Sequence, residues 1–301
     1  MARIKDIYVH VTDKIVSELE NGVRPWMQPW NAEHAAGRIT RPLRHNGTPY
    51  NGINILMLWS AALDNGYAAP YWLTYKQAKD LGAQVRKGER SSLVVYANTF
   101  TRTEENAAGE QEEHKIPFLK SYSVFSAEQI DGLPEHYTAL AQPVIDPVQR
   151  IEYADRFFAN TGADIRHGGN RAYYRIIADH IQMPPFEAFR VAESYVATLA
   201  HETTHWTRHP SRLDRHFGRK KFGDEGYARE ELVAELGSAF LSADLGITPE
   251  IRDDHAAYIG SWLKVLKEDK RAIFQAAAHA TRAVDYLHGL QEQEAATGTA
   301  A

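Results

Sequence analysis

Two histidines and a glutamate lie close together near the middle of the chain, in the segment LAHETTHWTRHP. Apolar residues just before them recur at helical spacing, which predicts an amphipathic helix that ends before Pro210. On such a helix His201 and His205 leave the same face and can bind one Zn²⁺ together. The neighbouring Glu202 would point toward the mouth of the site. It is therefore the candidate general base, which takes a proton from a water molecule that the metal activates.

A complete site needs a third protein ligand, and a second predicted helix, YAREELVAELGSAFL, offers two carboxylates. Glu231 and Glu235 lie four residues apart on one face, and small residues of this helix allow close packing against the first. We expect Glu231 to be the direct ligand and Glu235 to fix the tautomer of a ligand histidine, with the opposite assignment left open. Glu230 points elsewhere and is expected to be solvated. The predicted cofactor is one divalent metal, with Zn²⁺ as the default and Mn²⁺ as the alternative.

The same residues also allow a plainer interpretation, a polar helix that happens to contain histidines. The HExxH spacing arises by accident in roughly a few per cent of chains of this length and histidine content. If the HExxH spacing were accidental, no third ligand would be expected for the histidines. The carboxylates of the second helix therefore favour the metal site. His209 and His216 favour surface or structural roles. Tyr174 and Tyr227 are candidate donors to a developing oxyanion, although a buried aromatic role is the simpler interpretation of each.

The segment upstream of this helix, GADIRHGGNRAYYRIIADHIQMPP, predicts strands around a turn at HGGN, with the last strand closed by prolines. A zincin-type site uses an edge strand to lay out an extended substrate by backbone pairing. The order of strands, HExxH helix and ligand helix is suited to that use.

The composition excludes several other kinds of site. The 301 residues include no cysteine, so disulfides, thiolate nucleophiles and Cys-ligated clusters are excluded. The N-terminal sequence has no apolar signal segment, and no apolar run is long enough to span a bilayer. We therefore expect a cytoplasmic protein without a membrane partner.

A proline-rich segment predicts a boundary between two domains of an α+β protein. Residues 131–147, DGLPEHYTALAQPVIDP, contain three prolines and little periodicity. We expect a small N-terminal α+β domain at 1–130, a linker at 131–147, a zincin-like metallopeptidase domain at 148–290 and a disordered polar tail at 291–301. A linker of this kind predicts two bodies with a modest interface.

Several elements are predicted within these domains. The first helix, IKDIYVHVTDKIVSELENG, is amphipathic and is ended by Gly22. SLVVYANTF and KIPFLKSYSVF are rich in Val, Tyr and Phe and predict a hairpin with an acidic tip at Glu104–Glu113. After the linker, IEYADRFFANTG predicts a helix that is ended by Gly162. Its core-facing residues are expected to be Ile151, Tyr153, Ala154, Phe157 and Phe158.

The N-terminal half combines basic and aromatic residues in a way that is typical of single-stranded DNA binding. Between Arg38 and Arg90, eight basic residues stand against three acidic ones, with aromatic residues interleaved. Flat rings can stack on bases while neighbouring cations follow the phosphates. Prolines beside tryptophans also mark packed loops, and Trp59 is expected in the core, so a purely structural interpretation stays open. The candidate DNA-binding residues are Trp26, Trp30, Arg41, Arg44, Tyr50, Tyr71, Trp72, Tyr75, Lys76, Arg86 and Lys87.

Several motifs of the chain resemble one family, the plasmid-borne ArdC-type antirestriction proteins. PWMQPW, YNGINILMLW, YWLTYKQAKDLGAQVRKGE and SYSVFSAEQ resemble its N-terminal pattern, and AHETTHWT and YAREELVAELGSAFL its zincin-like, gluzincin-type C-terminal half. The resemblance runs from about Ile4 to His288. It implies an N-terminal domain that binds single-stranded DNA and a role in conjugation, in which plasmid DNA entering a recipient is shielded from restriction.

The resemblance leaves open whether the peptidase half cleaves a protein. The alternative function is an active metalloprotease that uses DNA for recruitment to DNA-associated proteins, with a protein substrate or a component of a restriction system as its partner. A third interpretation keeps both domains and gives the metal a structural role only.

Overall fold

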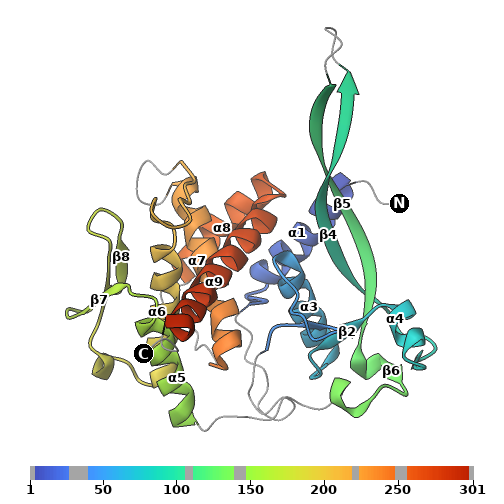
Figure 1. The fold of residues 1–301 in the computed structure, drawn as a ribbon, viewed down its shortest axis with the longest axis horizontal. Helices are drawn as coiled ribbons and strands as arrows, with labels where there is room; N and C mark the ends of the chain where they lie inside the picture. Colours follow the sequence, from blue (N-terminus) through green and yellow to red (C-terminus); the bar gives the residue numbers. More distant parts are fainter. Residues whose placement is uncertain are drawn as a thin grey trace.

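A computed structural model describes residues 4–26, 40–105, 111–138, 147–218, 224–247 and 256–297. Helices and strands are mixed in both halves, which confirms the predicted α+β class with two domains. The C-terminal half is mostly helical, and a long hairpin of the N-terminal half extends away from the helices (Figure 1). Among the described residues, no helix has both the length and the apolar character needed to cross a membrane.

The N-terminal half contains a four-stranded sheet in the order β1-β2-β5-β4. Its strands are β1 (Leu43–Arg44), β2 (Tyr71–Leu73), β4 (Ser92–Glu105) and β5 (Gln111–Ser126). β4 and β5 pair antiparallel along their length, so the predicted hairpin is confirmed. Within its predicted acidic tip, residues 106–110 lie outside the described residues.

Among the described residues of this half, the α-helices are α1 (Ile4–Glu20), α3 (Ile53–Asn65) and α4 (Tyr75–Asp80), and there is a second small sheet. β3 (Gln84–Val85) pairs antiparallel with β6 (Ile130–Asp131). Only Asp131, the last residue of β6, lies in the segment that was predicted as a linker. Tyr137 of that segment is buried in one apolar cluster with Val85 and Ile130, so the folded N-terminal domain continues into the segment.

The helices predicted for IKDIYVHVTDKIVSELENG and IEYADRFFANTG are both present, with one difference. α1 is followed by Gly22, which has a φ of 75°. The buried apolar residues of α1 recur mainly every four positions: Ile7, Val11, Ile15, Val16 and Leu19. In α5 (Pro147–Ala159), Ala154, Phe157 and Phe158 are buried as predicted. Tyr153, also predicted to face the core, is 40% exposed.

The C-terminal half combines a small sheet with the helices. Its strands are β7 (Asp164–His167), β8 (Tyr173–Arg175) and β9 (His180–Met183), in the order β7-β9-β8. The HGGN turn therefore does not join neighbouring strands, because β9 lies between β7 and β8. β7 pairs parallel and β8 pairs antiparallel with this central strand. β8 is consequently an edge strand.

The part of this half that the structure describes also contains the α-helices α6 (Ala192–Trp206), α7 (Glu225–Leu245), α8 (Ala256–Glu268) and α9 (Ala272–Thr297). α6 and α7 correspond to the predicted HExxH and ligand helices. α9 continues through most of the tail that was predicted to be disordered, so that prediction was wrong for those residues.

The two halves share one hydrophobic core rather than a modest interface. Trp59 of α3 packs edge-on against Phe240 of α7, with the ring centres 5.8 Å apart. At the rim of the same interface, Arg41 donates two hydrogen bonds to Asp244, at 2.6 and 2.7 Å. The expectation of two loosely joined bodies was therefore wrong, because the apolar faces of α1 and α3 are covered by helices of the C-terminal half.

Candidate metal centre

The site depends on the close approach of α6 and α7. A Cβ atom on Gly237 would lie only 2.5 Å from Cγ2 of Thr204, so the position on α7 that faces Thr204 has no room for a side chain. About two turns further toward the start of α6, the hydroxyl of Ser238 donates to the carbonyl of Ala197 at 2.9 Å. Small residues on α7 thus let the two helices meet, as the sequence predicted.

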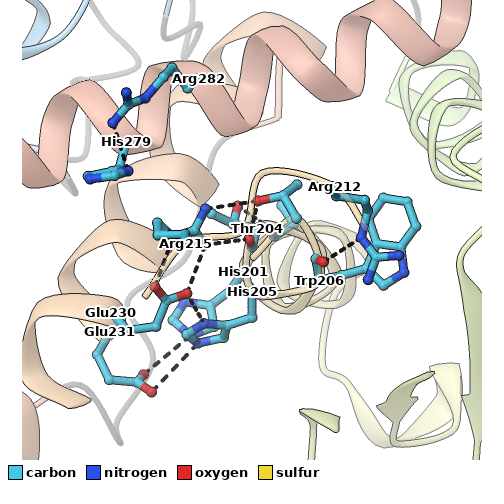
Figure 2. Close-up of polar contacts among 12 residues, drawn as sticks. His201, Thr204, His205, Trp206, Arg212, Arg215, Glu230, Glu231, His279 and Arg282 are labelled. Atoms are coloured by element: carbon cyan, nitrogen blue, oxygen red, sulfur yellow. Dashed lines mark hydrogen bonds and ion pairs between the residues drawn. The ribbon is translucent and has the colours of Figure 1, made fainter. Parts of the chain in front are cut away.

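This approach brings His201 and His205 of α6 to Glu231 of α7 (Figure 2). One possible ligand atom from each residue lies within 4.8 Å of the others. Nε2 of His201 lies 3.6 Å from Oε2 of Glu231, and Nε2 of His205 lies 3.6 Å from Oε1 of the same carboxylate. These separations exceed a hydrogen bond. Two ligands at about 2.1 Å from one tetrahedral ion would lie about 3.4 Å apart, so the donor set fits a shared divalent ion.

A second carboxylate holds the other nitrogen of His205. Nδ1 of His205 donates to Oε1 of Glu230 at 3.0 Å, and Glu230 is only 2% exposed. The expectation that Glu230 is solvated was therefore wrong. The reason is Arg215, whose Nε and Nη2 donate to the two oxygens of Glu230 at 2.8 Å each. Arg215 also donates to the carbonyl of Thr204 at 2.9 Å, which ties the segment after α6 back onto that helix.

The charges of this cluster shift one another's pKa values. Burial disfavours the charged form of His205, but the carboxylates of Glu231 and Glu230 outweigh it and raise the pKa of His205 to about 10. Burial would raise the pKa of Glu230, yet the hydrogen bonds and charge of Arg215 lower it to about 2. The pKa of Glu231 is likewise lowered, because the two histidines outweigh the effect of burial. His205 would release its proton when it binds a metal.

Glu235 approaches the other ligand histidine. Its Oε2 lies 3.8 Å from Nδ1 of His201, and the residue is 2% exposed. Glu231 thus faces the Nε2 atoms of both histidines, whereas Glu235 faces an Nδ1 atom. This arrangement favours Glu231 as the direct ligand and Glu235 as the outer carboxylate.

The candidate general base lies in the same helix. Glu202 is 5% exposed, and in the described part of the chain its carboxylate forms no hydrogen bond or ion pair. A buried carboxylate in this state is costly unless a ligand or water compensates it. Glu202 is therefore available for chemistry beside the ligand histidines.

The two tyrosines considered as oxyanion donors have other contacts. The hydroxyl of Tyr174 donates to Asp179 at 2.8 Å, and Arg212 pairs with the same carboxylate. Tyr227 lies one turn before Glu231 on α7, and its hydroxyl is 3.1 Å from that of Tyr258. Burial raises the pKa of Tyr227, and the charge of Glu231 raises it further, so Tyr227 keeps its proton. Only Tyr227 is near the ligand set.

The predicted DNA-binding residues divide into buried and exposed groups. Trp26, Tyr50 and Trp72 are 2%, 8% and 2% exposed, so they present no ring face to a base in this structure. Arg41 is occupied by Asp244. The structure contradicts the prediction that these residues contact DNA, because the three rings are packed in the core that the two halves share and Arg41 is paired with Asp244. Trp30 lies outside the described residues.

The remaining candidates lie on the surface. Tyr75 is 47% exposed at the start of α4, and Tyr71 is partly buried. Lys76 pairs with Asp80 at 2.5 Å, and Arg86 pairs with Glu89 at 2.7 Å. The other exposed candidates are Arg44 and Lys87.

The hairpin carries an exposed aromatic and basic face that the sequence interpretation missed. Tyr96 and Tyr122 are 47% and 45% exposed. Tyr96 is paired with Lys120 across the hairpin, and residues two apart along a strand share a face, so Tyr122 and Phe118 lie on that same face. The ammonium of Lys120 is 5.2 Å from the Phe118 ring centre. We call Tyr96, Phe118, Lys120 and Tyr122 the hairpin face. The sequence feature that marks this face is FLKSY, in which Phe118, Lys120 and Tyr122 alternate with residues of the other face. We interpreted this segment only as a strand.

Comparison with known proteins matches the two halves of the chain to two different families. Residues 5–125 match the N-terminal domain of anti-restriction factor ArdC, and residues 152–279 match a zincin-like metallopeptidase family. A crystal structure of the antirestriction ArdC protein from plasmid R388, in its metal-free form, is 49% identical and superposes with a TM-score of 0.80. The match covers 96% of this chain and 98% of that one. The Mn(II)-bound structure of the same protein is 48% identical with a TM-score of 0.77, over 94% and 97% of the two chains.

Two further proteins are similar to this chain in sequence. The uncharacterized protein y4eC of Sinorhizobium fredii (strain NBRC 101917 / NGR234) is 45% identical over 95% of this chain and 92% of its own length. A DNA primase TraC of Escherichia coli is 38% identical over 98% of this chain. The chain spans only 28% of the length of that primase.

Proposed function

The chain belongs to the ArdC family of antirestriction proteins, and from this we propose that it binds single-stranded DNA and protects incoming plasmid DNA from restriction in the recipient cytoplasm. The main support is that both halves of one chain, in the same order, match an antirestriction protein over nearly its whole length. The proposal assigns DNA binding to the N-terminal half and metal binding to the C-terminal half.

The hairpin face and the exposed residues near α4 are the proposed DNA-binding surface. The hairpin face combines three aromatic rings with a lysine that has no acidic partner among the described residues. Rings of this kind can stack on bases of any sequence, whereas duplex DNA keeps its bases stacked on each other. This supports a preference for single strands. Tyr75 and Lys87 extend the surface beyond the hairpin.

The proposed metal centre consists of His201, His205 and Glu231, and its ion is divalent. Mn(II) is bound in a structure of the R388 relative, while Zn²⁺ is the usual ion for two imidazoles and a carboxylate. Metal analysis of protein purified without added metal distinguishes the two. When bound, such an ion supplies Lewis-acid activation of water. Glu230 and Glu235 would orient the histidines, and Glu202 would accept a proton.

A second candidate function is proteolysis of DNA-associated proteins. The observation that favours it is Glu202, a buried carboxylate beside the ligands that has no partner within the described residues. Shielding of DNA needs no bond-breaking step, whereas proteolysis needs a general base, whose help is worth about 10²–10⁴-fold in rate. Replacement of Glu202 by Gln keeps the size of the side chain and spares the ligands.

The test is conjugative transfer of an unmodified plasmid into recipients with and without a restriction system. We expect a plasmid encoding Glu202→Gln to be protected like the parent, and one encoding Tyr96→Ala with Tyr122→Ala to lose protection. Metal content, melting temperature and DNA affinity are measured for each variant. If Glu202→Gln abolishes protection while these three properties are unchanged, the metalloprotease candidate replaces the shielding proposal.

A further inference from the structure

A hydrogen bond joins the N-terminal half to the surroundings of the proposed metal ligands. Nε1 of Trp26 donates to Oε1 of Glu235 at 3.3 Å. The guanidinium of Arg24 lies 4.0 Å from the same oxygen. The other oxygen of Glu235, Oε2, lies 3.8 Å from Nδ1 of His201. The Glu235 carboxylate therefore stands between the N-terminal half and a histidine of the metal centre.

We propose that Trp26 is a positioning residue for this metal centre, which acts by holding Glu235 beside His201. The N-terminal half would then help to set the metal affinity of the C-terminal half. The inference rests on the proposed metal centre and adds a residue that lies 209 positions before Glu235 in the chain.

The burial of both partners explains why their contact is specific. Trp26 and Glu235 are each 2% exposed. A buried carboxylate must be compensated by donors or cations, and here the indole N–H and Arg24 compensate one oxygen. This leaves the second oxygen on the side of His201. If Trp26 were absent, the carboxylate would have to find another partner, and its position beside the histidine would change.

Glu235 faces the nitrogen of His201 that would not bind the metal but that fixes the tautomer of the ring. Nε2 of His201 faces Glu231, so Nδ1 is the nitrogen left for an outer carboxylate. A carboxylate near Nδ1 favours the proton there and keeps the Nε2 lone pair for an ion. At 3.8 Å the contact is longer than a hydrogen bond, so in this structure Glu235 acts on His201 as a nearby negative charge.

Trp262 provides a matched control for the packing role of Trp26. The two rings pack edge-on with centres 6.0 Å apart, and Trp262 is 1% exposed. Nε1 of Trp262 has no hydrogen-bond partner within the described part of the chain. Replacement of either tryptophan by Phe removes similar volume from the same aromatic cluster, but only Trp26→Phe removes the donor to Glu235.

The experiment measures Mn²⁺ affinity by the electron paramagnetic resonance signal of the free ion. We expect Glu235→Gln to weaken affinity by about 10–100-fold, as loss of outer carboxylates does, and Trp26→Phe by about 10-fold. Trp262→Phe should keep the parental affinity. Because Trp26 is proposed to act through Glu235, the double variant should bind no more weakly than Glu235→Gln alone.

Melting curves and near-UV circular dichroism of the metal-free variants establish that each is folded. If Trp26→Phe does not fold, Glu235→Gln and Arg24→Gln test the two ends of the link with the indole left in place. Equal losses of affinity in Trp26→Phe and Trp262→Phe, or parental affinity in Glu235→Gln, would overturn the inference. If the parent itself takes up no Mn²⁺, or if the double variant His201→Ala with His205→Ala binds Mn²⁺ as well as the parent, the proposed metal centre is wrong. The inference about Trp26 then fails as well.

Discussion

The candidate metal centre and the hairpin face both present charged and aromatic side chains, but only the candidate metal centre does so in the interior. His205, Glu230 and Glu231 are each less than 10% exposed, and their charges are compensated by one another and by Arg215. On the hairpin, Tyr96 and Tyr122 are nearly half exposed. Water can solvate that face in the absence of a ligand.

This difference in burial determines how strongly the residues of each region depend on one another. In a low-dielectric interior a charge without a partner is expensive, so every residue of the metal centre depends on the others. On an exposed surface water screens each charge, and contributions are small and nearly independent. We therefore expect single substitutions to have large, coupled effects at the metal centre and small, additive effects on the hairpin.

The largest expected effect is the loss of Arg215. Its side chain and that of Glu230 are 1% and 2% exposed. Arg215→Met removes the cation that donates to both oxygens of this buried carboxylate and leaves it the single hydrogen bond from His205. We expect a loss of about 3–5 kcal/mol in the free energy of unfolding, measured by urea denaturation of the metal-free protein. Arg166→Met, which breaks an exposed pair with Asp164, is the control and should leave the midpoint unchanged. Equal destabilisation by both variants would contradict the contrast between interior and surface.

Removal of the metal should have the next largest effect. An ion that binds only the folded state, at a free concentration 100 times its dissociation constant, stabilises that state by about 2.7 kcal/mol. The parent should therefore melt at a lower temperature after chelation and recover when Mn²⁺ or Zn²⁺ is added back. His201→Ala with His205→Ala should retain no metal, and its melting temperature should not respond to either ion. A metal-dependent shift in that double variant would show that the ion binds elsewhere.

The parts of the two regions that the sequence could predict are those set by short-range spacing. The HExxH pattern places His201 and His205 on one face of a single helix, whatever packs around it. Arg215 and its bonds to Glu230 follow from the tertiary path of the segment after α6, and no local pattern marks them. Glu230 was misjudged for this reason, because helical position alone does not reveal which face a neighbouring segment covers.

The aromatic residues of the N-terminal half show the same limit. Residue type predicts that the rings of Trp72 and Tyr96 can stack, but it does not say whether they stack on a DNA base or pack inside the protein. Trp72 is 2% exposed because its short strand lies between β1 and β5 in the sheet and its ring packs against Tyr67, whereas Tyr96 lies on a hairpin that leaves the body. Exposure depends on how far the hairpin extends beyond the core, and the strand pattern of the sequence does not fix that distance.

Substitution of the hairpin tyrosines should weaken DNA binding without altering stability. We expect Tyr96→Ala and Tyr122→Ala each to cost about 1–3 kcal/mol in affinity for a single-stranded oligonucleotide, measured by fluorescence anisotropy. Tyr153→Ala removes a similarly exposed tyrosine from α5 and should bind DNA like the parent. Trp72→Ala should instead unfold more easily, by about 3–5 kcal/mol, because it empties a core position. Parental DNA affinity in both hairpin variants would remove this face from the proposed surface.

The smallest expected effects concern single cations and are visible only in the salt dependence of binding. Each cation that contacts a phosphate of single-stranded DNA contributes about 0.7 to the slope of log affinity against log salt concentration. Lys87 and Lys120 have no acidic partner among the described residues, whereas Lys76 is paired with Asp80. Lys87→Ala and Lys120→Ala should therefore each flatten the slope by about that amount. Lys76→Ala should flatten it less, because Asp80 already neutralises part of its charge.

Lys267 is the matched control for these cations, since it is an exposed lysine on α8 that is paired with Glu20. Lys267→Ala should leave the slope unchanged, while the tyrosine variants should lower affinity equally at every salt concentration, because stacking releases no counterions. If Lys76→Ala flattens the slope as much as Lys120→Ala, the ion pair with Asp80 opens when DNA binds, and the DNA-binding surface reaches α4. If neither Lys87→Ala nor Lys120→Ala changes the slope, the phosphates follow a different path, and the cations beside the hairpin rings do not contact DNA.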